Sequence, residues 1–157
     1  MGTTNLPPFV RPAIRLGSFK RGLLVLSALA MAVVLFLATR IDPYTSDGEP
    51  LLQGTHQQLG LPPCAFVVMT GEPCPSCGMT TSFALLMAGD VGNSLRANFV
   101  GTFLALFCIA AIPWSLVATW KGRYPGLRAI ERPLLILVGA FTLLMLGRWG
   151  IILLVDR

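Results

Sequence analysis

Three long stretches with few or no charges dominate the hydropathy pattern of this chain. They cover residues 22–39, 97–120 and 133–155, and within them only the third carries a charge, Arg148. About 20 apolar residues in a helix cross the roughly 30 Å hydrocarbon core of a bilayer, so each stretch is long enough to span it. The pattern predicts an all-α membrane protein with three transmembrane helices.

The first apolar stretch follows a basic segment, residues 1–21, and this order is also typical of a signal peptide. The run of 18 residues is long for a signal-peptide core, and no A-x-A cleavage site follows it. We therefore expect an uncleaved membrane anchor. The length of the chain favours one membrane domain, residues 22–157, behind a basic tail.

The segment 40–96 is richer in Asp, Gly and Pro, which mark loops and turns. Inside it, Cys74 and Pro75 have the form of a helix start, because proline suits the first helical position. We expect a helix from Pro75 to Met87, ended by Gly89 and Asp90. Its apolar stripe must lie on other apolar groups and comprises Met79, Phe83, Leu86 and Met87.

Asp90 is expected to cap a second short helix, through Leu95, that leads into the 97–120 span. The two short helices would form an external helical hairpin. It would either lie on the outer leaflet or re-enter it, as is tolerated where broken backbone is buried in protein.

Composition and charge support a lipid environment. The chain is 54% hydrophobic and 12% charged, whereas soluble domains carry about 25% charged residues. Its net charge of +5 does not indicate nucleic-acid binding, because the basic residues flank apolar runs instead of forming an exposed polar face. The expected partners are the lipid bilayer and a second membrane protein, and no nucleic acid is expected.

The distribution of basic residues predicts the orientation. Four Lys or Arg residues precede the first span and four lie in the loop 121–132, but the long segment 40–96 has two. By the positive-inside rule, the N-terminus and that loop are cytoplasmic and the cysteine motif is external.

Arg148 needs an explanation, because an arginine within a span costs about 2.5 to 3.5 kcal/mol on insertion scales. Its side chain could extend along its own helix toward the interface. Alternatively, it bonds Asp90, Glu72 or carbonyl groups of the hairpin and so holds the cysteine motif against the third span.

The order of residues from 64 to 98 resembles a bacterial membrane-protein family catalogued as domain of unknown function 2752. Its pattern is an early cysteine, a Thr-Gly pair, C-P-x-C-G-x-T-R, a Gly-Asp pair and Asn-Pro. The matching residues are Cys64, Thr70, Gly71, Cys74, Pro75, Cys77, Gly78, Thr80, Gly89, Asp90 and Asn98. Thr81 stands where the family usually has arginine, and Phe99 where it has proline. The resemblance implies the plasma membrane of a bacterium and brings no established reaction.

Three interpretations of the cysteines remain open. In the first, a disulfide between Cys64 and Cys74 or Cys77 fastens the external hairpin, as is common outside the cytoplasm. In the second, Cys74 attacks and Cys77 resolves in a redox pair. In the third, a zinc ion is held by a Cys3His set of His56, Cys64, Cys74 and Cys77.

No cofactor is firmly implied by the sequence, although the third interpretation would bring zinc, and no catalytic residue is assigned outside the redox alternative. The external acids are scattered and no nucleophile stands beside a base. We therefore expect a non-enzymatic structural or partner-docking module, with a membrane thiol-disulfide oxidoreductase or a zinc-binding module as the alternatives. Cys108, inside the second span, is expected to be a small buried apolar residue.

Overall fold

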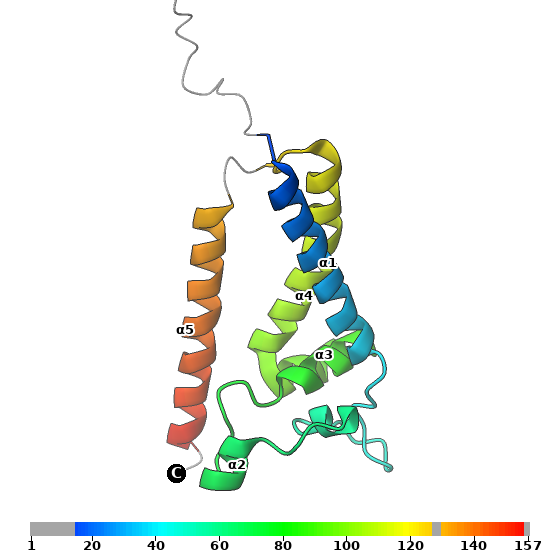
Figure 1. Ribbon diagram of the computed structural model, residues 1–157. Helices are drawn as coiled ribbons and strands as arrows, with labels where there is room; N and C mark the ends of the chain where they lie inside the picture. The colour runs from blue at the N-terminus through cyan, green and yellow to red at the C-terminus, as the bar shows by residue number, and fades with distance from the viewer. Residues whose placement is uncertain (1–14, 127–129, 156–157) are drawn as a thin grey trace, which may run out of the picture.

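The computed structural model describes residues 15–126 and 130–155 (Figure 1). Within these ranges the chain is helical and has no strand, apart from one isolated bridge between Tyr44 and Pro50. The predicted all-α class is confirmed. Most of the basic tail, including Arg11, and Arg128 of the 121–132 loop lie outside the described residues.

Three helices are long and apolar enough to cross a membrane: α1 (Ser18–Ala38), α4 (Val91–Lys121) and α5 (Glu131–Val155). They contain the predicted spans 97–120 and 133–155 and all but the last residue of 22–39, so the chain is a multi-pass integral membrane protein. The main difference is at the start of α4, which begins six residues before the predicted span at 97. Asp90 caps it as predicted, and its carboxylate accepts a hydrogen bond from the backbone N–H of Asn93.

The core lies where α3 (Met79–Met87) crosses one end of the α1–α4 pair (Figure 1). Phe83 is buried there against Leu35 and Ala38 of α1 and Ala105 of α4, with the other residues of the predicted α3 stripe packed around it. Cys108 is buried in the same cluster, as expected. The small side chain of Ala105 allows this close approach of three helices.

Polar contacts also join α3 to α4. The hydroxyl of Ser94 donates to the Ser82 carbonyl at 2.7 Å and lies 2.7 Å from the hydroxyl of Thr102, and all three residues are buried. A buried hydroxyl without a partner would be costly, so this chain of bonds fixes the register of the two helices. The predicted helical hairpin therefore exists, formed by α3 and the first turns of α4.

The segment before α3 holds two short helices that the sequence pattern did not predict, η1 (Thr55–Leu59) and α2 (Ala65–Thr70). Both lie beyond the end of the α1–α4 pair that α3 covers (Figure 1). Their Pro- and Gly-rich flanks resemble loop sequence, which masked them. His56 in η1 and Cys64, directly before α2, line the same cavity as the cysteines of the CPSCG motif.

α5 stands apart from the other two spanning helices (Figure 1), and none of the residues in its most apolar stretch is buried. Its apolar side chains are therefore available to lipid. Near its C-terminal end, Arg148 and Trp149 donate hydrogen bonds to the Ala97 and Pro73 carbonyls, and at its start Glu131 pairs with Lys20.

Candidate functional site

The CPSCG motif forms a tight turn instead of the predicted helix start. The N–H of Cys77 donates to the Cys74 carbonyl at 3.0 Å, and α3 begins only at Met79. Pro75 occupies the second position of this turn, where a fixed φ near −65° is favourable. The prediction of a helix from Pro75 was wrong because Gly78, with φ of 80°, separates the turn from α3.

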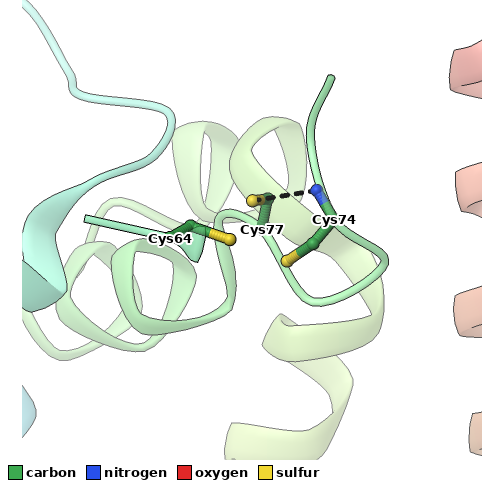
Figure 2. Close-up of side chains that lie close together, drawn as sticks. All are labelled: Cys64, Cys74 and Cys77. Atoms are coloured by element: carbon green, nitrogen blue, oxygen red, sulfur yellow. Dashed lines mark hydrogen bonds between the residues drawn. The ribbon is translucent and has the colours of Figure 1, made fainter. Parts of the chain in front are cut away.

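The turn also changes the electrostatic surroundings of Cys74. Cys74 lies five residues before Met79, the first residue of α3, and is therefore outside the helix, so the positive end of the helix dipole does not act on it directly. The turn instead supplies a backbone donor: the N–H of Cys74 points at Cys77 Sγ, 3.2 Å away (Figure 2). A backbone N–H directed at a sulfur stabilises the thiolate form.

Cys64 reaches the same point from the other side of the site. It is the residue before α2, and Figure 2 shows its sulfur directed toward Cys77 and Cys74. The three sulfur atoms all lie within 4.8 Å of one another. A tetrahedral zinc ion with Zn–S bonds of about 2.3 Å separates two of its sulfur ligands by about 3.8 Å, so only small side-chain movements would place all three on one ion.

All four cysteines are free thiols in this structure. The disulfide expected between Cys64 and Cys74 or Cys77 would join sulfurs that lie close together here, and it stays a prediction. A single disulfide would join only two of the three sulfurs and leave the third cysteine as a free thiol.

The two thiols of the turn differ in acidity. For Cys74, burial raises the pKa, but hydrogen bonds from the Ser76 hydroxyl and from the other two thiols outweigh it and leave the pKa below its ordinary value. For Cys77, burial and the hydrogen bond shared with Cys74 raise the pKa to about 12. The cluster therefore holds its first negative charge on Cys74 and shares a proton between the two sulfurs.

A cavity of about 650 Å³ opens beside the three sulfurs. His56, Gln57 and Thr80 contribute to its wall together with the cysteines. His56, predicted as the fourth ligand, lies at this cavity but outside the sulfur cluster, and its Nε2 is 3.1 Å from the Pro62 carbonyl oxygen. The structure thus brings together three of the four predicted ligands.

Gly78 fixes the turn against α4. A side-chain carbon at this position would lie 2.6 Å from the Ala97 carbonyl oxygen and 2.8 Å from that of Leu52. Both neighbours are backbone atoms that cannot easily move, and the positive φ also favours glycine. The motif glycine is therefore required by both space and conformation.

Asn98 explains how α4 accommodates the turn. It is buried and extended (φ −162°, ψ 100°) inside an otherwise helical segment. Its side chain donates to the Cys77 carbonyl at 3.0 Å and accepts from the Gly101 N–H at 3.0 Å. The second bond replaces the one that Gly101 would make to the Ala97 carbonyl in a regular helix, so that carbonyl is free for another donor.

That donor is Arg148. Its Nη2 lies 2.9 Å from the Ala97 carbonyl oxygen. Of the partners considered from the sequence, the structure selects a carbonyl of the hairpin over Asp90 or Glu72. The neighbouring Trp149 donates from Nε1 to the Pro73 carbonyl at 2.8 Å and makes an edge contact with Phe66 of α2. Trp149 was not predicted as a site residue, and the only sign of its role in the sequence is its position beside Arg148.

The remaining motif residues have structural positions. Gly71 ends α2 with φ of 77°, and Gly89 turns the chain between α3 and α4 with φ of 85°. Asp90 Oδ2 accepts hydrogen bonds from the Tyr44 hydroxyl at 3.1 Å and from the side chain of Asn93 at 2.7 Å. These hydrogen bonds, with that from Asn93 first, lower the pKa of Asp90 below its usual value.

The two departures from the family pattern are accommodated locally. Thr81, in place of arginine, is buried and its hydroxyl lies 2.9 Å from that of Thr55 in η1. Phe99 stands where a proline would force the preceding residue to be extended. Asn98 is extended nevertheless, because its side chain makes the bonds described above.

Comparison with known proteins agrees with the resemblance seen in the sequence. Residues 64–112 match the family described as protein of unknown function (DUF2752). No curated protein and no solved structure matched the chain. The matched segment contains the three clustered cysteines, the Gly78 contact and the Asn98 break, so the resemblance covers the complete sulfur site.

Proposed function

We propose that this integral membrane protein binds a thiophilic divalent metal ion, zinc in the first instance, through the thiolates of Cys64, Cys74 and Cys77. The observation that carries the proposal is the convergence of three free sulfurs, all within 4.8 Å, from two segments of the chain. Cysteine thiolates are the ligands that zinc prefers in structural sites.

The surroundings of the sulfurs support metal binding. The N–H of Cys74 directed at Cys77 Sγ stabilises a thiolate ligand, and the Gly78 and Asn98 contacts hold the turn in a fixed position on α4. Three protein ligands leave a fourth coordination position, which the cavity beside the sulfurs can serve. Either a water molecule or His56, after releasing the Pro62 carbonyl, would fill it.

In this proposal the metal ion fastens α2 and the CPSCG turn to the membrane helices. It takes the place of the disulfide expected from the sequence, and the protein remains a non-enzymatic module whose extramembrane segment is held in one shape for docking to a membrane partner. Metal coordination also protects the thiols from oxidation outside the cytoplasm.

The proposed orientation is N-terminus in the cytoplasm and cysteine site outside, in the plasma membrane of a bacterium. Its support is the separation of basic residues between the two ends of the helical bundle. Near the end opposite α3 lie Arg15, Lys20, Arg21, Lys121, Arg123 and Arg132. The end that carries the site has Arg40, Arg96 and Arg148, and the positive-inside rule places the more basic end in the cytoplasm.

A second candidate is thiol-disulfide exchange by Cys74 and Cys77, favoured by the proximity of two free sulfurs within one turn. In that reaction the Cys74 thiolate would attack a partner's disulfide. Cys77 would then attack the Cys74 sulfur of the mixed disulfide and release the partner's second thiolate, so that the partner's disulfide is reduced by the two electrons that the Cys74 and Cys77 thiols lose in forming their own disulfide.

Metal analysis combined with thiol counting tests the proposal. The protein is expressed in zinc-supplied cells and purified in detergent without chelator; bound metal is measured, and thiols are counted before and after chelation. One zinc ion per chain and three thiols that become reactive only after chelation are expected. A metal-free chain with a readily reversible Cys74–Cys77 bond would favour redox exchange, and one resistant bridge from Cys64 would favour the structural disulfide.

A further inference from the structure

Arg148 brings a positive charge into the membrane domain without a carboxylate to balance it. In the part of the chain that the structure describes, the ion pair found is Lys20 with Glu131, at the opposite end of the bundle. Arg148 Nη2 is bonded to the Ala97 carbonyl, but Nη1 is buried and has no hydrogen-bond partner. A buried cationic nitrogen in this condition is costly unless a negative group lies nearby.

The contacts around the Arg148 side chain place it next to the sulfur site. The Ala97 carbonyl that accepts from Arg148 also lies against Gly78, the residue after Cys77. On the other side, Trp149 is bonded to the Pro73 carbonyl, directly before Cys74. Adjacent residues of α5 thus bond the Pro73 carbonyl, directly before the turn, and the Ala97 carbonyl, which lies against Gly78 directly after it.

The charge of the metal site matches this arrangement. Three thiolates and one divalent ion leave a net charge of about −1 in a partly buried place. Outside the cysteines, the groups named above that contact the turn, Asn98, Gly78 and Trp149, are uncharged.

We infer that Arg148 is the counter-charge of the metal–thiolate site, supplied from a separate membrane helix. The inference rests on the proposed function. The metal-loaded site and the guanidinium neutralise each other, which lowers the cost of keeping both out of water. Arg148 is thus a positioning residue that raises metal affinity without being a ligand, and metal loading in turn holds the C-terminal end of α5 on the site.

Three variants separate this role from simple attachment of α5. Arg148→Gln removes the charge and keeps an N–H donor. Arg148→Lys keeps the charge but loses the planar fork. Trp149→Phe removes the bond to the Pro73 carbonyl and leaves the charge and an aromatic ring in place. Cobalt(II) is titrated into each metal-free protein in detergent, its sulfur-to-metal absorption band is followed, and helix content and size are checked by circular dichroism and gel filtration.

Arg148→Gln is expected to weaken cobalt binding by roughly 10- to 100-fold, the usual cost of losing an outer-shell partner. Arg148→Lys should recover most of that loss, and Trp149→Phe should lose less than Arg148→Gln. Unchanged affinity in a folded Arg148→Gln protein would overturn the inference, as would a lysine variant or a Trp149→Phe variant as weak as the glutamine variant. Absence of the band in the wild-type protein would instead refute the metal site itself.

Discussion

Serine in place of Cys64, Cys74 or Cys77 is expected to reduce zinc affinity by more than about 100-fold in each case. Loss of an outer-shell partner already costs roughly 10- to 100-fold, and a serine hydroxyl is a far poorer zinc ligand than a thiolate. Affinity is measured by competition with a chromophoric chelator, using protein purified in detergent.

Cys108→Ser is the matched control for these substitutions. Cys108 is buried in α4 against the α1 and α3 core, away from the sulfur cluster, and a serine there can bond to a carbonyl of its own helix. It should therefore leave zinc affinity unchanged. If one of the three clustered cysteines tolerated serine equally well, that residue would not be a ligand and the three-sulfur site would be wrong.

Gly78→Ala is expected to destabilise the folded protein by at least about 2 kcal/mol. A residue with a side chain pays about 1 to 2 kcal/mol in the left-handed conformation, and displacing packed backbone adds about 1 to 3 kcal/mol. The added carbon would meet two carbonyl oxygens, those of Ala97 and Leu52. Thermal unfolding in detergent, followed by circular dichroism, measures the loss.

Gly71→Ala separates the two contributions. Gly71 has a similar φ of 77°, but an added side-chain carbon would meet nothing within 4 Å. It should therefore cost only the conformational part, and its melting temperature should lie between those of the wild type and Gly78→Ala. Equal losses in the two variants would show that the close approach of the CPSCG turn to α4 does not contribute to stability.

The spanning helices could be predicted from the sequence because a bilayer demands a long run of apolar residues whatever the contacts between helices. The same holds for the stripe on α3, whose 3.6-residue period is a local property. The start of α3 could not be predicted from local preference. Proline at position 75 is equally compatible with a helix start and with a turn, and the choice depends on Gly78 packing against Ala97, a contact across 19 positions of the chain.

The sequence predicted which cysteines form the sulfur site, but it did not decide between a disulfide, a redox pair and a metal site. Spacing connected Cys64, Cys74 and Cys77, and the structure brings their sulfurs together. His56 was predicted as a fourth ligand because it is the only histidine of the chain. Its position depends on the short helix η1, which could not be predicted because the surrounding sequence has the composition of a loop. Arg148 bonds the Ala97 carbonyl, which has no helical partner because the Gly101 N–H bonds the Asn98 side chain instead. A sequence pattern does not predict which carbonyl loses its partner where a helix is interrupted.

X-ray absorption at the zinc edge tests the three-thiolate site most directly, because it counts the ligands around the bound ion. For the zinc-loaded protein in detergent, we predict three sulfur neighbours at about 2.3 Å and one nitrogen or oxygen neighbour at about 2.0 to 2.1 Å. Two or fewer sulfur neighbours, or no ion retained after loading, would contradict the account.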